Sequence, residues 1–135
     1  MPTWLPIAFT EVTTTSQARH DTGATLVVGT SDASRATIQR LVPSATVSAG
    51  RVMVAVFQGQ QRTGGYTIRV TGVERRGDQL AVRAAFSAPG PGAIVTQALT
   101  SPAHVVSIAA ADATGLREGV LLDETGTERA RTTIT

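Results

Sequence analysis

Apolar and polar residues alternate along much of this chain with the period of two that is typical of β-strands. The clearest examples are residues 66–71 and 79–86, where every second residue is apolar. Gly77-Asp78 lies between them and has the composition of a tight turn, so residues 66–86 are predicted to form a hairpin. Shorter apolar segments predict further strands at residues 5–12, 24–30, 51–57, 105–109, 120–122 and 129–134.

Two of these segments have a predicted position in a sheet. Residues 51–57 are apolar on both faces, which favours a central strand packed on each side. Pro6 cannot donate a ladder hydrogen bond and therefore places residues 5–12 at an edge. The last two segments are predicted to pair as a hairpin around Thr125-Gly126-Thr127.

Only one segment has the features of a helix. Ser31 or Asp32 can cap its first turn, and Arg40 lies near its carboxyl end. Pro43 stops it. The pattern as a whole predicts a mainly β fold, an antiparallel β-sandwich or partly open barrel with one short helix. A length of 135 residues fits a single domain, residues 1–135, in which residues 109–135 form a C-terminal extension.

Two glycine-rich turns are the most specific local motifs. They are Thr63-Gly64-Gly65-Tyr66 and Pro89-Gly90-Pro91-Gly92, and both contain residues that fix the backbone in shaped turns. They are either structural turns or rigid loops that present a binding surface. In the second case Arg62 and Gln61 offer hydrogen bonds to a partner. Thr96 and Gln97 could hold the second turn in its shape.

These turns, followed by the run Val95-Thr96-Gln97-Ala98-Leu99-Thr100-Ser101-Pro102, resemble the C-terminal domain of PrcB-like protease-complex subunits over residues 51–108. The resemblance implies a non-catalytic accessory domain that binds a protease or a cell-envelope protein. It also implies a cell-surface or extracytoplasmic location if a leader has been trimmed, and a cytoplasmic location stays open beside it. The candidate partner-binding residues are Arg62, Thr63, Gly64, Gly65, Tyr66, Pro89, Gly90, Pro91, Gly92 and Gln97.

Two other functions remain open beside the accessory role. The first is a peptidase inhibitor that places the Thr63–Tyr66 turn in a protease cleft. The second is a structural subunit of an envelope assembly, which would form homo-oligomers through exposed edge strands at the chain ends.

Composition narrows the chemistry. A net charge of +2, with the basic residues spread along the chain, argues against nucleic-acid binding. The chain has no cysteine and only two histidines, His20 and His104, and shows no catalytic, metal-binding or cofactor-binding motif. We therefore expect no enzymatic activity, no metal and no cofactor. No apolar run is long enough for a transmembrane helix.

Overall fold

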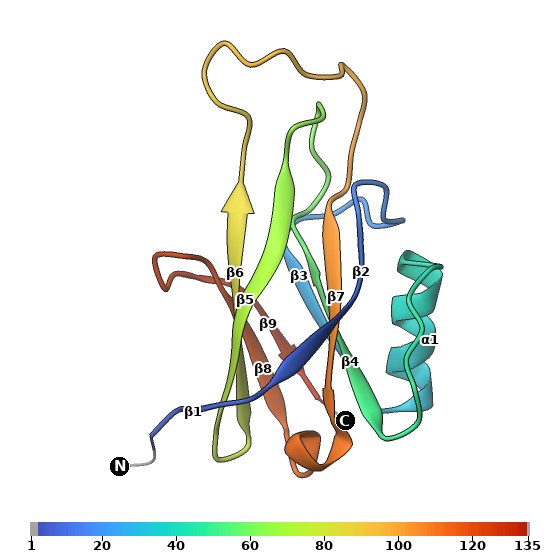
Figure 1. Cartoon of the computed structure of the whole chain (residues 1–135), viewed down its shortest axis with the longest axis vertical. Helices are drawn as coiled ribbons and strands as arrows, with labels where there is room; N and C mark the ends of the chain where they lie inside the picture. The colour runs from blue at the N-terminus through green and yellow to red at the C-terminus, as the bar shows by residue number, and fades with distance from the viewer. Residues whose placement is uncertain (1–2, 135) are drawn as a thin grey trace.

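The protein is built from two β-sheets and one short α-helix, as a computed structural model that describes residues 3–134 shows (Figure 1). The strands of one sheet lie in the order β1-β5-β6-β8-β9 and those of the other in the order β2-β7-β4-β3. The mainly β fold with one short helix is therefore confirmed. The strands are β1 (Leu5–Pro6), β2 (Phe9–Thr15), β3 (Thr25–Gly29), β4 (Arg51–Phe57), β5 (Thr67–Arg76), β6 (Gln79–Ser87), β7 (Ala103–Ala109), β8 (Glu118–Leu122) and β9 (Glu128–Thr133).

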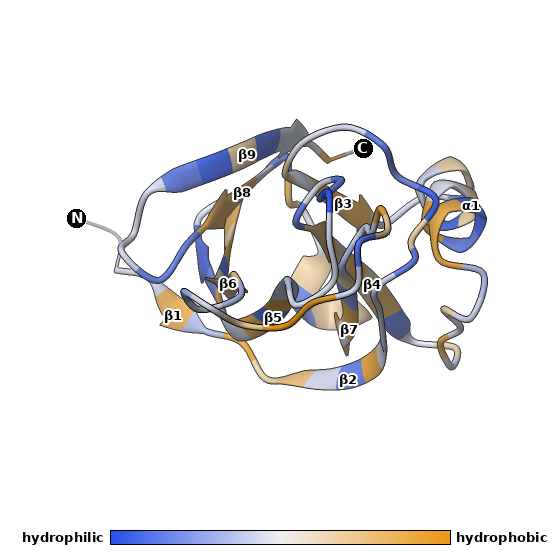
Figure 2. Cartoon of the chain, turned by 90° about the horizontal axis from the view of Figure 1, so that it is seen from above, coloured by the Kyte–Doolittle hydropathy of each residue, from blue (hydrophilic) through white to orange (hydrophobic). Residues whose placement is uncertain are grey.

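Strand β4 is central in its sheet, between β7 and β3, as its two apolar faces predict. One face, with Val54 and Val56, belongs to the core between the two sheets. The other face, with Met53 and Phe57, belongs to a second core beneath the helix α1 (Asp32–Leu41). Figure 2 shows the two sheets facing each other, with α1 outside the four-stranded sheet.

Helix α1 begins and ends where its sequence indicates. The Ser31 hydroxyl accepts from the backbone N–H of Ser34, and the Ser34 hydroxyl accepts in turn from the backbone N–H of Ser31. This reciprocal capping satisfies two N–H groups that the first turn would otherwise leave unpaired. The helix ends at Leu41, and Pro43 follows its C-cap Val42.

The single strand predicted for residues 5–12 is wrong. The structure has two strands there, and they belong to different sheets: β1 pairs with β5, whereas β2 pairs with β7. The chain leaves the five-stranded sheet at Ile7, whose N–H donates to the Val73 carbonyl at 2.7 Å. The local pattern could not reveal this change because it depends on pairing with strands far along the chain.

One strand pair departs from the antiparallel arrangement. Strands β6 and β8 run parallel, and all the other ladders within residues 3–134 are antiparallel. The reason lies in the connection, because β7 and a short 3₁₀ helix, η1 (Ala110–Ala113), return the chain to the end of the sheet where β6 begins. Strand β8 then pairs with β9 as a hairpin.

Replacing Ser31 with Ala should lower the free energy of unfolding by about 1 kcal/mol, because the first turn of α1 loses its side-chain cap. Urea unfolding followed by circular dichroism measures the difference. Ser31→Asp is the matched control and should stay close to the wild type, since aspartate caps equally well. Equal loss in both variants would contradict the capping role.

Candidate functional site

The two glycine-rich turns lie together at one end of the molecule, where loops 58–66 and 88–102 extend beyond the sheets (Figure 1). We call these two loops the loop end. Backbone hydrogen bonds join them directly: Gly64 N–H donates to the Thr96 carbonyl at 2.9 Å, and Gln61 and Thr100 exchange two bonds at 2.8 and 2.9 Å. The loop end is therefore one hydrogen-bonded unit.

Both the backbone conformation and the close packing at position 65 favour glycine over other residues. The φ of Gly65, +88°, lies in the region that favours glycine. A Cβ atom added there would lie 3.0 Å from a methyl carbon of Val95 and 3.1 Å from the ring of Pro89. The Thr63–Tyr66 turn consequently packs against the residues that begin and follow the Pro-Gly turn.

The Pro-Gly segment forms a tight turn of its own. Ala93 N–H donates to the Gly90 carbonyl at 3.0 Å, and Gly92 has a φ of +78°. Proline at the second position and a positive-φ glycine at the third are the signature of a type II turn. The shape of this turn is fixed by its own backbone, whereas Thr96 bonds to Gly64 in the other loop.

The remaining candidate residues occupy different positions at the loop end. Thr63 donates its hydroxyl to the Gly64 carbonyl at 2.9 Å, and its own carbonyl accepts from the Thr100 hydroxyl at 2.7 Å. Tyr66 is half-buried where β5 begins. Arg62 and Gln97 are exposed. Thr63 is therefore bonded within the loop end, and Figure 1 shows that loop 88–102 forms the outermost part of this end.

Gln58, which no sequence motif indicates, holds both ends of loop 88–102. Its backbone N–H donates to the Pro102 carbonyl at 3.0 Å, and its side-chain amide donates to the Ser87 carbonyl at 3.0 Å. The residue is buried and directly follows β4. Both ends of the loop are thus tied to one residue, the first through its side chain and the second through its backbone.

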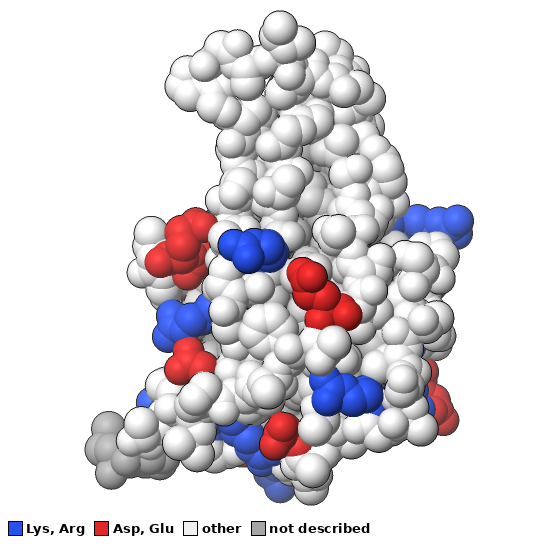
Figure 3. All heavy atoms as spheres, in the orientation of Figure 1, with Lys and Arg blue, Asp and Glu red and all other residues white. Residues whose placement is uncertain are grey.

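Ile94 and Leu99 are the exposed large apolar residues of the loop end, and sequence reasoning missed them as well. The side chain of Ile94 is fully exposed, and that of Leu99 is 59% exposed. Residues 88–102 contain no charged side chain, and Figure 3 shows an uncharged surface at this end on the face in view. The only signal in the sequence was an uncharged run between two prolines, since exposure depends on the loop standing clear of the sheets.

His104 is buried between the sheets, with an exposed fraction of 2%, and both of its ring nitrogens are engaged. Nδ1 accepts from the Val70 N–H at 2.9 Å, and Nε2 lies 2.9 Å from the Glu11 carboxylate. These partners assign the proton to Nε2. Burial lowers the pKa of His104 and outweighs the neighbouring Glu11 carboxylate, which raises it. No lone pair is left for a proton transfer or a metal.

His20 has a structural environment as well. Its Nε2 lies within hydrogen-bond distance of the Thr22 and Thr25 hydroxyls, both at 2.9 Å, and its ring packs on Phe57 with centroids 4.8 Å apart. Among residues 3–134, His, Asp and Glu side chains form no group of three or more that could hold a metal ion. In the same residues no helix is long and apolar enough to cross a membrane.

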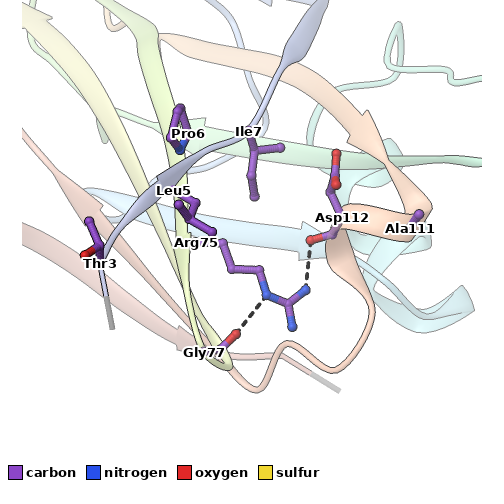
Figure 4. A pocket seen from close by; sticks show the side chains of 8 residues that line it. All are labelled: Thr3, Leu5, Pro6, Ile7, Arg75, Gly77, Ala111 and Asp112. Atoms are coloured by element: carbon purple, nitrogen blue, oxygen red, sulfur yellow. Dashed lines mark hydrogen bonds between the residues drawn. The ribbon is translucent and has the colours of Figure 1, made fainter. Parts of the chain in front are cut away.

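A hollow of about 500 Å³ lies at the opposite end of the molecule, beneath the N-terminal segment (Figure 4). Arg75 crosses it and donates to the Gly77 carbonyl at 2.8 Å and to the Asp112 carbonyl at 3.0 Å. The guanidinium of Arg75 therefore joins the β5–β6 turn to η1, which is a structural role.

Comparison with known families gives a match for the middle of the chain. Residues 52–109 match the family described as PrcB C-terminal, which confirms the resemblance seen in the sequence. The matched segment runs from β4 to β7 and contains Gln58 and both loops of the loop end. Searches of curated proteins and of solved structures gave no significant match.

Gly65→Ala should lower the free energy of unfolding by about 1–2 kcal/mol, because alanine is strained at positive φ and its methyl group would press on Val95 and Pro89. Urea unfolding measures the effect. Gly90→Ala is the control, since Gly90 has no positive φ and an added Cβ meets nothing within 4 Å. Equal losses in the two variants would show that the turn is not tightly packed.

Stability should fall as the pH drops below 6.5, because the unfolded histidine takes up a proton at its ordinary pKa of 6.5 while folded His104 takes it up only at lower pH. The loss ends once the pH is below the folded pKa. Measurements above pH 5 isolate this effect, because hydrogen bonds lower the pKa of Glu118 from 4.5 and of Asp123 from 3.8.

The control for this pH dependence is His104→Gln, whose amide can accept from Val70 and donate to Glu11 but does not titrate. The fall in stability between pH 7.5 and 5 should be smaller in this variant than in the wild type. His20 is present in both proteins, so the difference reports on His104 alone. Identical pH profiles would refute the buried neutral histidine.

Proposed function

We propose that this protein is a non-catalytic accessory domain that binds another protein through its loop end. The observation that carries the proposal is the exposure of Ile94 and Leu99 on an uncharged loop that is held in place by hydrogen bonds. The PrcB C-terminal match supports a role in a protease complex, and the partner we propose is a protease or an associated cell-envelope protein. An extracytoplasmic location belongs to the same proposal.

The energetics of the loop end favour protein binding. Burying a large aliphatic side chain contributes about 1.5–3 kcal/mol, so Ile94 and Leu99 are suited to serve as anchors. The centres of protein interfaces are poor in charged residues, as residues 88–102 are. Arg62 and Gln97 are exposed and supply polar groups for the surrounding rim.

Preorganisation of the loop adds to this argument. A flexible loop would lose conformational entropy on binding, and that loss would weaken the complex. Loop 88–102 is instead tied to Gly64 and Gln61 through Thr96 and Thr100, and to Gln58 at its base. The environments of the two histidines support a non-catalytic role, because both ring nitrogens of His104 and Nε2 of His20 have structural partners.

The experiment is site-specific photo-crosslinking in the source cells, with a photoreactive amino acid at position 94, followed by mass spectrometry. A matched control carries the same amino acid at Leu5, which is 64% exposed on β1 at the other end of the molecule. A partner captured from position 94 and not from position 5 is the expected result. The same captures from both positions would overturn the proposal.

Once the partner is purified, Ile94→Asp and Leu99→Asp should each weaken its binding at least tenfold, because each loses an apolar anchor worth at least 1.4 kcal/mol. Leu5→Asp should leave the affinity unchanged. Calorimetric titration measures all three. If neither loop variant weakens binding, the partner is held elsewhere.

If the partner is a protease, activity assays separate the accessory role from inhibition. The accessory role predicts unchanged initial activity and a longer active lifetime for the protease. A dose-dependent loss of activity would instead indicate an inhibitor. Oligomers that form without any partner and survive both loop substitutions would indicate a structural assembly.

A further inference from the structure

The edge of β5 is covered along only part of its length. Near its end, Arg75 pairs with Leu5 of β1, and Val73 accepts a hydrogen bond from Ile7. The chain then crosses to the other sheet, where β2 pairs with β7. A wedge therefore opens between the start of β5 and the end of β2. We call this space the β2–β5 wedge.

The wedge contains two adjoining hollows of about 330 and 240 Å³. Thr14 of β2 and Thr67 and Ile68 of β5 line both of them. The other residues that line at least one hollow are Glu11, Thr15, Ser16, Tyr66, Arg69, Ala85, Ser87, Pro102 and His104. Hydroxyl groups are frequent in this set, so the walls are suited to polar groups such as peptide N–H and C=O.

The backbone of β5 turns hydrogen-bonding groups toward this wedge. Phe86, opposite Ile68, donates its N–H away from β5 to the Glu124 carboxylate at 2.9 Å. In an antiparallel ladder this makes Ile68 and Phe86 a non-hydrogen-bonded pair. The N–H and C=O of Ile68 therefore point away from β6, into the wedge.

The next outward-facing N–H along this edge, that of Val70, already has a hydrogen-bond partner. The Val70 N–H points the same way as the Ile68 N–H, and it donates to Nδ1 of the buried His104 ring. A side chain from β7 thus takes the place of a strand partner at Val70. Within residues 3–134 no strand pairs with this side of β5 at Ile68.

Two other edge strands, β9 and β2, carry the usual protection against strand addition. Strand β9 has Glu128, Arg129 and Arg131 along its six residues and is mostly hydrophilic in Figure 2. Strand β2 has an irregular register between Glu11 and Thr13. Charged residues and bulges are the means by which edge strands avoid pairing with other chains.

We infer that the β2–β5 wedge is a binding site for an extended peptide segment of a partner protein, which adds to β5 as a strand. The chain supplies its own precedent, because β1 pairs with this same edge of β5 a few residues further along. The segment continues the line of β1 and runs antiparallel to β5. Its backbone bonds to the N–H and C=O of Ile68.

Recognition at this site depends on the peptide backbone more than on charge. Glu11 lies on the β2 wall and Arg69 on the β5 wall. Their charges have opposite signs, so together they give the wedge no net charge. Strand addition draws its affinity from main-chain hydrogen bonds, and the alternate side chains then select the sequence. Because His104 already takes the partner's place at Val70, the open stretch runs from Tyr66 to Arg69 and, at about 3.3 Å per residue, accommodates about four residues of the segment.

The site does not depend on the proposed role of the loop end, since it uses neither Ile94 nor Leu99. The experiment begins with a display library of random linear heptapeptides selected against the whole protein. Each selected peptide is titrated into isotope-labelled protein and followed by NMR. Binding is expected to shift the amide signals of Ile68 and Val70 and to slow hydrogen exchange of the Ile68 amide.

N-methylation of single peptide residues tests the strand geometry without altering the protein. Methyl groups on alternate amides, those that face β5, should weaken binding at least tenfold, and methyl groups on the intervening amides should matter less. A uniform effect along the peptide would overturn the proposal. Selection of no peptide that protects Ile68 would overturn it as well.

Thr14→Trp tests the location, because Thr14 is exposed and lines both hollows. The indole should fill the wedge and weaken peptide binding at least tenfold. Thr133→Trp is the matched control, placed on β9 at the far edge of the same sheet as β5, and should leave binding unchanged. Equal binding by both variants, or peptides that contact the loop end, would refute the site. So would occupation of the wedge by a second copy of this chain.

Discussion

The burial of β4 on both faces is the constraint on which the rest of the structure depends. One face needs a second sheet to cover it, and the other needs α1. The strand is therefore held more firmly than any exposed element, and Gln58 follows it directly. Because Gln58 bonds to Ser87 and to Pro102, the rigidity of β4 reaches both ends of loop 88–102.

This connection explains how an uncharged, exposed loop can keep one conformation. A loop of fifteen residues, 88–102, would ordinarily be mobile, and exposed aliphatic side chains such as Ile94 would then promote nonspecific association. Here Gln58 bonds to residues at both ends of the loop, and Thr96 and Thr100 bond to loop 58–66. The segment that matches the PrcB C-terminal family contains all of these parts, while β1 to β3, α1, β8 and β9 lie outside it.

Sequence patterns predicted the features that depend on neighbouring residues. The β5–β6 hairpin, the helix and the two-sided burial of β4 each follow from local alternation, capping or composition. The separation of β1 from β2 could not be predicted this way, because it depends on pairing with strands that lie far along the chain. The parallel pairing of β6 with β8 depends on a long connection in the same sense.

At the candidate site, too, the features that depend on neighbouring residues were predictable and those that depend on distant residues were not. The two turns were visible as motifs, but their hydrogen bonds to each other join residues more than thirty positions apart, such as Gly64 and Thr96. The exposure of Ile94 depends on how far the loop stands from the sheets, which hydropathy does not encode. The sequence offered no catalytic motif around His104, but only the structure could show which residues, Val70 and Glu11, lie against its two nitrogens.

The most direct test of this account is amide hydrogen exchange of the free protein at Gly64, Thr100 and Gln61, measured by NMR. These amides lie in loops, and without structure they would exchange at the rates of an unfolded peptide. These amides should be protected, and Gln58→Ala should reduce this protection, because it removes the side-chain bond to Ser87 at one end of loop 88–102 and leaves the backbone bond to Pro102. Exchange at unfolded rates in the wild type would contradict a preformed loop end.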